Sequence, residues 1–331
     1  MPRDTGQAQR SLKATNLFLF NIYFGESEMS SEITTAFVQQ YRAKVELLAQ
    51  QMGSKLQGAV DYNSGYVGKA VSLVEQFAPV EAIVRVGRHG QTPMGNAGQD
   101  RRWVRPVDYE VPAELFDTVD KLRMIIDPLN PYAQSQALAI GRAKDRAIIS
   151  AFFDPSINGE DGTTTQAFNT SGVMTLNGSM VVDKSTGGAN TGLNVSKLIK
   201  AKTNFMRQNV DLDMESLFLA ITADEHEKLL GEIQIVSTDY NSRPVLVDGK
   251  LQSFLGINFI HTELIPAPVA NTRKLPIWCK SGVHLAEWAG LNVDIGQRRD
   301  LRNSWQVYTT ATFNATRLRE DKVGQIEVHV A

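Results

Sequence analysis

The pattern of apolar and polar residues along this chain predicts helices in its first part and mostly strands in its second part. Apolar residues recur every three or four positions in four segments, a spacing that places them on one face of a helix: residues 32–52, 112–126, 131–153 and 195–208. Elsewhere they alternate with polar residues or form short runs bounded by turn residues, which predicts strands: residues 79–88, 102–111, 217–221, 257–261, 275–279, 283–288, 305–317 and 325–330. This order is typical of an α+β fold.

The third of these helices is expected to be long. Asn130 can cap its start, with Pro131 at the first helical position. Pro155 disfavours the helical conformation at the residue before it, so the helix should end near Phe153. A helix of about 23 residues is about 34 Å long. Its small and apolar residues form a narrow stripe that permits close backbone approach, as expected for a helix that supports the elements packed on it: Ala133, Ala137, Ile140, Ala147 and Ala151.

Residues 79–88 and 102–111 predict a two-stranded hairpin with a long tip, because the stretch from Gly87 to Arg101 holds four glycines and Pro93. Pro106 cannot donate to a ladder, which favours an edge or two-stranded ribbon. An isolated hairpin is marginally stable in water, so this one needs a docking surface on its own chain or on another subunit. The candidate contact residues are basic or aromatic: Arg85, Arg88, His89, Arg101, Arg102, Trp103 and Arg105. Glutamate at Arg101 and Arg102 is expected to block assembly and leave a folded subunit.

The N-terminal region combines a polar start, an apolar run and a helix. Residues 1–16 are polar, and Leu17–Phe24 is apolar apart from Asn21. Because Asn21 interrupts the run and a poor cleavage site follows it, we interpret the run as a hydrophobic latch rather than a signal peptide. The helix at residues 32–52 either lies on a surface or forms a seam with a partner helix. Its candidate contact residues are spaced 3, 4, 3, 4: Val38, Tyr41, Val45, Leu48 and Met52.

Composition excludes several classes of protein. The chain is 42% hydrophobic and 21% charged, which is ordinary for a folded chain. Its net charge of −2 argues against a whole-protein nucleic-acid binder, because such proteins are usually strongly basic. No run approaches the roughly 18 apolar residues of a membrane span. The single cysteine, Cys279, excludes an internal disulfide framework and is expected to be a small buried apolar residue.

No segment carries a recognisable catalytic, cofactor or metal site. The glycine-rich stretches at 159–163 and 187–192 lack the lysine of a phosphate-binding loop. His226-Glu227 begins like a zinc-protease helix, but Leu230 stands where the second histidine should be. We therefore expect no enzyme activity, no cofactor and no metal. The basic hairpin could meet phosphates or acidic faces of a neighbouring subunit, and the overall acidity favours protein.

Several linked segments resemble the major capsid proteins of tailed bacteriophages, which have the HK97 fold. The order of elements agrees: an N-terminal arm with a helix, a long charged hairpin, a long "spine" helix, a mixed sheet domain and a final strand that returns to the first domain. The local sequences that carry the resemblance are residues 37–55, Arg88–Pro93, Arg101–Val104, Asp120–Arg123, Ile126–Pro128, Tyr132–Ala133 and Ala139–Arg142.

The resemblance implies regions rather than catalytic residues. It implies an N-terminal arm and helix, a linker with the extended hairpin called the E-loop, a peripheral domain with the spine helix, an axial domain, and strands that return to the peripheral domain: residues 1–55, 56–112, 113–213, 214–299 and 300–331. The implied function is a structural protein that assembles as pentamers and hexamers into an icosahedral shell around double-stranded phage DNA. The implied location is the virion, after assembly in the host cytoplasm.

The resemblance also implies partners besides further copies of the chain. About 30 residues precede the first expected helix, which favours a separate scaffolding protein over a built-in scaffolding domain. A portal protein, a decoration protein and weak non-specific contact with packaged DNA are the other expected partners, and no membrane is expected. Two alternatives stay open: an encapsulin-like shell of the same fold that stores enzymes, and a nucleic-acid-binding protein that acts through the basic hairpin.

Overall fold

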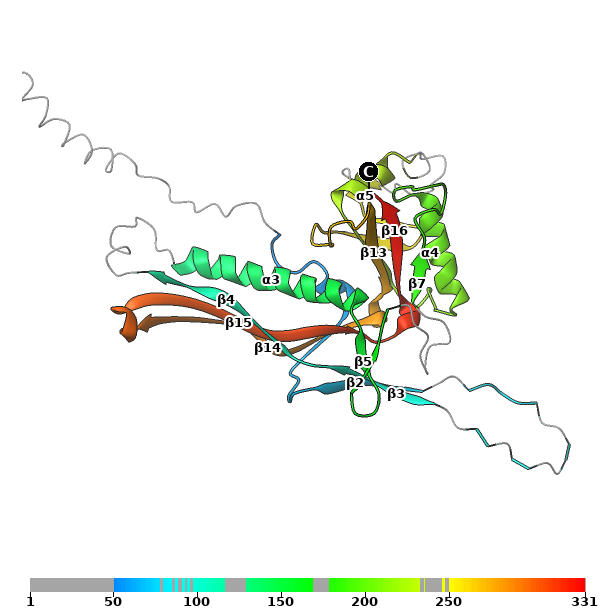
Figure 1. The fold of residues 1–331 in the computed structure, drawn as a ribbon, viewed down its shortest axis with the longest axis horizontal. Helices are drawn as coiled ribbons and strands as arrows, with labels where there is room; N and C mark the ends of the chain where they lie inside the picture. Colours follow the sequence, from blue (N-terminus) through cyan, green and yellow to red (C-terminus); the bar gives the residue numbers. More distant parts are fainter. Residues whose placement is uncertain are drawn as a thin grey trace, which may run out of the picture.

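The computed structural model describes residues 51–77, 80–84, 87–88, 91–92, 94–95, 98–116, 129–168, 179–232, 235, 246–247 and 250–330. These residues form an elongated layer of one helix on a sheet, a second body built on a six-stranded sheet, and a projecting hairpin (Figure 1). The fold is thus α+β, as the sequence predicted. No helix in the described part of the chain is long and apolar enough to cross a membrane.

The elongated layer places α3 (Leu129–Phe153) along a four-stranded sheet of order β1-β14-β15-β4 (Figure 1). The helix α3 ends at Phe153 as predicted, but it begins at Leu129, so Asn130 is its second residue rather than its N-cap. On β15, Val307, Thr309, Ala311 and Phe313 are buried and the residues between them are less so, which confirms the predicted alternation. The strands are β1 (Asp61–Ser64), β14 (Val283–Arg298), β15 (Ser304–Arg317) and β4 (Val107–Phe116).

The second body contains a six-stranded sheet of order β11-β12-β8-β13-β16-β7, with α4 (Val195–Arg207) packed on β7 and β16. Thr222 and Glu225 form a capping box at the start of α5 (Ala223–Leu230). A separate two-stranded ribbon pairs the residues on either side of Asp248-Gly249. The strands are β7 (Met180–Val182), β8 (Leu217–Ile221), β11 (Ser253–Phe254), β12 (Ile257–His261), β13 (Thr272–Cys279) and β16 (Val323–His329), with β9 (Leu246–Val247) and β10 (Lys250–Leu251) in the ribbon.

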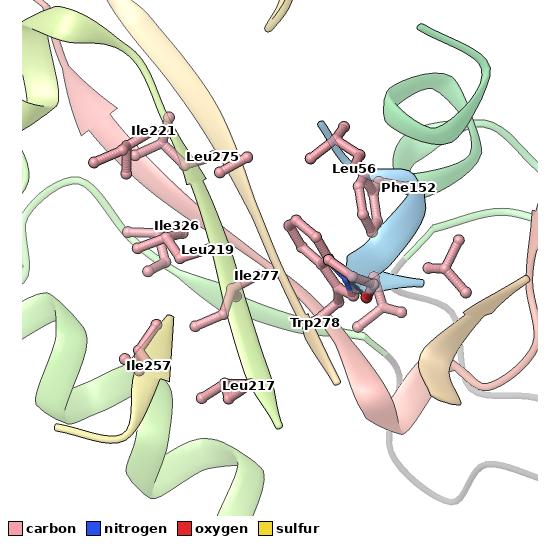
Figure 2. Packing of buried hydrophobic residues seen from close by; sticks show 14 of the residues in the cluster. Leu56, Phe152, Leu217, Leu219, Ile221, Ile257, Leu275, Ile277, Trp278 and Ile326 are labelled. Carbon is pink, nitrogen blue, oxygen red and sulfur yellow. Dashed lines mark hydrogen bonds between the residues drawn. The ribbon is translucent and has the colours of Figure 1, made fainter. Parts of the chain in front are cut away.

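Trp278 joins the two bodies. Ile277 faces the aliphatic core of the six-stranded sheet, whereas Trp278 points the other way, toward Phe152 at the end of α3 and toward Leu56 (Figure 2). The Trp278 and Phe152 ring centroids lie 4.6 Å apart, and Trp278 Nε1 donates a hydrogen bond to the Ala59 carbonyl at 2.9 Å. Both faces of β13 are therefore buried, one in each body. Cys279, the next residue, is fully buried as predicted, and burial raises the pKa of its thiol to about 12.

Three expected elements differ in the structure. The partner of β3 (Gln99–Val104) is β2 (Val71–Phe77) rather than residues 79–88, and β4 leaves the hairpin to pair with β15. The extended segment is interrupted between β3 and β4 at Pro106, because proline has no N–H to donate to a neighbouring strand. Residues 112–116, expected to start a helix, continue β4 instead. Pro112 is tolerated there because β4 is an edge strand with a register shift beside it.

Three short strands occur within residues 154–194, a stretch rich in Gly, Ser, Thr and Asn: β5 (Ser156–Asn158), β6 (Thr164–Gln166) and β7. Two strands of the six-stranded sheet, β7 and β16, lie outside residues 214–299, the range expected for the axial domain. β16, expected to return to the peripheral domain, instead pairs with β13. Four single turns of 3₁₀ helix complete the described elements: η1 (Gln57–Ala59), η2 (Lys280–Gly282), η3 (Arg299–Leu301) and η4 (Glu320–Lys322).

The chain segment before β1 is anchored on α3 through Asp145, which is fully buried. The Asp145 carboxylate accepts hydrogen bonds from Ser54 Oγ at 2.5 Å and from the backbone N–H groups of Lys55 and Leu56 at 2.9 and 3.1 Å. One turn earlier, Gly141 lets the chain approach the helix closely, since a methyl group there would lie 2.7 Å from Gly53 Cα. The anchor fixes where the N-terminal region leaves the body.

Replacing Gly141 by alanine is expected to destabilise the subunit by about 1–3 kcal/mol, because the new methyl group would overpack against backbone atoms. In an unobstructed helix the same change stabilises by about 1 kcal/mol, so the direction of the change in stability shows whether the chain approaches the helix closely at this position. Urea unfolding of the unassembled subunit measures the effect. Gly58→Ala is the matched control, because a methyl group at Gly58 meets open space. Equal stability of both variants would contradict the close approach.

Lys197 on α4 is a fully buried lysine. Its ammonium donates hydrogen bonds to the carbonyl oxygens of Thr191 at 2.7 Å and Glu327 at 3.0 Å, which ties the helix to β16. Loss of hydration lowers the pKa of Lys197 from 10.5 to about 8, and the nearby charge of Lys228 acts in the same direction. The folded protein therefore releases this proton more readily than the unfolded chain does.

We expect the contribution of Lys197 to the free energy of unfolding to rise between about pH 8 and 10.5, because the unfolded lysine still holds the proton that the folded one has lost. The upper limit for one proton is about 1.4 kcal/mol per pH unit. Urea unfolding measures the free energy of unfolding of the wild type and of Lys197→Met across this range. The wild-type value minus the Lys197→Met value should increase with pH. A Lys200→Met variant, altered on the exposed side of α4, should follow the wild type. A pH-independent difference would contradict the lowered pKa.

Candidate assembly interface

The last residue of β2 and the described part of the hairpin beyond β2 and β3 carry exposed apolar side chains. This segment projects away from both bodies (Figure 1). Single exposed apolar residues are normal, but a group of them on one projecting segment is typical of a surface that another molecule covers. The side chains are between 61% and 100% exposed: Phe77, Val80, Ile83, Val84 and Met94. The sequence interpretation centred on the arginines and missed these residues, although the apolar spacing of Val80, Ile83 and Val84 was visible.

The predicted contact residues divide into different environments. Arg101 on β3 forms an ion pair with Glu75 on β2, with Nη2 and Oε1 2.7 Å apart and both side chains about half exposed. Such surface pairs contribute little stability, about 0–1 kcal/mol. Arg88 is exposed and takes part in a contact of its own. Arg85 and His89 lie outside the described residues.

Trp103 and Arg105 attach the root of the hairpin to the short β5–β6 hairpin of the same chain. Trp103 Nε1 donates to the Gly159 carbonyl at 2.8 Å, and Arg105 Nη2 donates to the Gly162 carbonyl at 3.0 Å. Gly162 has φ +63°, and a methyl group there would lie 3.0 Å from the Trp103 ring. Both the backbone conformation and the close ring contact therefore favour glycine at this position.

Arg102 is buried within the subunit, with 1% of its surface exposed. Its guanidinium donates to Ser156 Oγ at 2.5 Å and to Gln166 Oε1 at 2.8 Å, and lies 3.8 Å from the carboxylate of Glu320. Burial lowers the pKa of Arg102, and the charge of Glu320 opposes that effect. The expectation that Arg102→Glu would leave a folded subunit is corrected by this burial, because a second carboxylate would face Glu320.

Glu320 also pairs with Arg317, and both side chains are fully buried. Arg317 Nε lies 3.1 Å from the carboxylate, and Arg317 Nη1 donates to the carbonyls of Phe152 at 2.8 Å and Asp154 at 2.5 Å. Arg317 thus neutralises the negative end of the α3 dipole. We call Arg102, Arg317 and Glu320 the buried charge cluster. It joins the hairpin root, the end of α3 and the turn between β15 and β16.

The contacts predicted for the N-terminal helix are mostly outside the described residues, which is where Val38, Tyr41, Val45 and Leu48 lie. Gln51 and Met52 are not helical, and the Met52 side chain is exposed. The last two residues of the expected helix, 51 and 52, are therefore not part of a helix, and the Gln51 side chain instead donates hydrogen bonds to the Gly53 carbonyl and to Asp145. No group of three or more metal-binding side chains occurs among the described residues.

The comparisons with known proteins agree on one kind of protein. A family model described as "Phage capsid protein" matches residues 33–330. None of the curated proteins matches the chain.

Similar solved structures include three particle shells. The capsid of cyanophage P-SCSP1u has a TM-score of 0.64 at 13% identity and covers 88% of this chain and 93% of its own. The capsid of Ralstonia phage GP4 has a TM-score of 0.61 at 11% identity, with coverage of 88% and 96%. The capsid of a native GTA particle has a TM-score of 0.61 at 11% identity, with coverage of 88% and 95%. At these identities the likeness shows the fold.

Proposed function

The chain belongs to the phage capsid protein family, and we propose that it assembles as pentamers and hexamers into an icosahedral shell around double-stranded phage DNA. As a member of that family it is a structural, non-enzymatic protein of the virion capsid and forms the shell with further copies of itself. Its fold is the α+β, HK97-like capsid fold.

The observation that carries the proposal is the projecting hairpin. The segment that carries its exposed apolar side chains projects away from both described bodies, so a neighbouring molecule can reach and cover them (Figure 1). The buried charge cluster and the β5–β6 hairpin fix its root. A rigidly rooted arm with an apolar surface suits repeated contact with a neighbouring copy, and closed symmetry multiplies such contacts.

The proposed regions follow the expected boundaries. Residues 1–55 are the N-terminal arm, 56–112 the linker and E-loop, 113–213 the peripheral domain with α3 as spine helix, and 214–299 the axial domain. Residues 300–331 complete the peripheral domain through β15, while β16 adds a strand to the six-stranded sheet. Arg85, Arg88, His89 and Arg101 are proposed to add charge pairs at the E-loop contact, whereas Arg102, Trp103 and Arg105 position its root. The helical residues Val38, Tyr41, Val45 and Leu48 are proposed arm contacts.

The proposed partners, besides further copies, are a separate scaffolding protein, a portal protein and a decoration protein. Packaged DNA is proposed to make weak, non-specific contacts, consistent with a net charge of −2. Assembly is proposed to take place in the host cytoplasm.

Negative-stain electron microscopy of the full chain, expressed alone and together with its scaffolding protein, tests the proposal. We expect closed shells, or rings of five and six subunits, in at least the second sample. Uniform monomers in both samples would contradict self-assembly through pentamers and hexamers.

A further inference from the structure

A cleft of about 400 Å³ lies between the hairpin root, α3 and β15. Its walls include two aromatic side chains, two arginines, one carboxylate and one serine, so its charge is net positive: Trp103, Tyr109, Arg105, Arg146, Asp154 and Ser150. Arg146 and Ser150 are on the exposed side of α3, and Arg146 has no hydrogen bond or ion pair within the described part of the chain. The cleft therefore suits a segment with both apolar and acidic side chains.

The segment Leu17–Glu28 of this chain has that pattern, and no contact is assigned to it in the proposed function. Residues 17–28 read Leu-Phe-Leu-Phe-Asn-Ile-Tyr-Phe-Gly-Glu-Ser-Glu. In an extended chain, alternate residues share one face. That face of the segment would carry four apolar side chains followed by two carboxylates: Phe18, Phe20, Ile22, Phe24, Glu26 and Glu28.

We propose that the cleft receives the Leu17–Glu28 segment of a second copy of the chain, with apolar side chains against Trp103 and Tyr109 and carboxylates against Arg105 and Arg146. The inference rests on the proposed shell function, because it needs a neighbouring copy. Charge excludes the tip of a neighbour's hairpin as the occupant, since that tip is basic and so is the cleft.

The geometry of α3 favours a neighbour's segment over the subunit's own. Asp145 anchors residues 54–56 of the same chain on one face of α3. At about 100° per residue, the cleft residues Ala147 and Ser150 lie roughly 200° and 140° around the helix from Asp145. The subunit's own N-terminal region thus leaves α3 on the face opposite the cleft.

Cross-linking between introduced cysteines tests the occupant in assembled shells of the full chain. Ser27→Cys and Ser150→Cys are combined in one chain, and a short bismaleimide is added. Cys279 can stay, because it is buried and its thiol pKa is raised to about 12. We expect a ladder of covalent multimers on a denaturing gel, since each copy gives one segment and receives another.

Three controls make the ladder specific. Either cysteine alone can yield dimers at most, and Ser27→Cys with Lys200→Cys, on α4 away from the cleft, should give no ladder. A monomer cross-linked within itself would overturn the neighbour as occupant. Free thiols at both positions in well-formed shells would overturn docking in the cleft altogether.

Charge reversal supplies an independent test. Arg146→Glu should lower the yield of shells about tenfold or more, because like charges then face each other across the contact. Adding Glu26→Lys and Glu28→Lys to the same chain should restore the yield to within about twofold of the wild type. Wild-type yield from Arg146→Glu would refute the inference and leave the shell function intact. Absence of shells from the wild-type chain with its scaffolding protein would instead contradict the proposed function.

Discussion

Replacement of Glu320 by glutamine is expected to lower the free energy of unfolding of the unassembled subunit by about 3–5 kcal/mol. Glu320 is the carboxylate that pairs with both buried arginines of the cluster, at 3.1 Å from Arg317 and 3.8 Å from Arg102. Glutamine keeps the size of the side chain but removes its charge. Two guanidinium groups would then stay buried without a paired anion, and urea unfolding measures the loss.

The matched control for this variant is Glu75→Gln. Glu75 also pairs with an arginine, at 2.7 Å, but both partners are about half exposed. We expect its loss to change the free energy of unfolding by about 1 kcal/mol or less. If Glu320→Gln were as stable as Glu75→Gln, the buried charge cluster would not hold the hairpin root to the end of α3. If Glu320→Gln fails to fold, a Glu320→Asp variant should recover part of the stability.

Serine at Val80, Ile83 and Val84 together is expected to reduce the yield of shells about tenfold or more and to leave the subunit folded. Full burial of a valine or isoleucine side chain is worth about 1.5–3 kcal/mol, and each subunit repeats the contact. These side chains are 74% to 84% exposed in the single subunit, so their loss should change its free energy of unfolding by about 0.5 kcal/mol or less. Electron microscopy and urea unfolding measure the two effects separately.

A triple variant of the same chemistry elsewhere is the control. Val67, Val269 and Ile199 are also exposed, by 88%, 79% and 51%, but lie outside the hairpin. Serine at these three positions should leave the yield of shells closer to the wild type than serine in the hairpin does. Equal losses from both triple variants would mean that exposed apolar surface in general, rather than the hairpin, drives assembly.

The elements that the sequence predicts well are those with local signals. Pro131 and Pro155 lie close to the two ends of α3, and strict alternation from Trp305 to Ala315 marks β15. Pairing partners were harder to predict. The strand β2 follows a stretch with four glycines, residues 53–68, that shows no clear strand pattern, and β4 leaves its expected partner after Pro106. The three-residue strands β5 and β6 consist mainly of small polar residues and have no apolar pattern to recognise.

The candidate interface could be located from the sequence, but the roles of its residues could not. Arg101 and Arg102 are neighbours in a basic run, yet one is half exposed and the other is buried. The difference depends on Ser156, Gln166 and Glu320, which are distant along the chain. Burial of an arginine requires partners that only the tertiary structure brings together.

The central claim is that copies of this chain assemble through the projecting hairpin. The most direct measurement is a cryo-electron microscopy reconstruction of the assembled shell, from which the exposed fractions of Val80, Ile83, Val84 and Met94 are compared with those in the single subunit. We predict that a neighbouring copy covers these side chains, which are 74% to 100% exposed in the subunit alone. A shell in which they remain in solvent would contradict the claim.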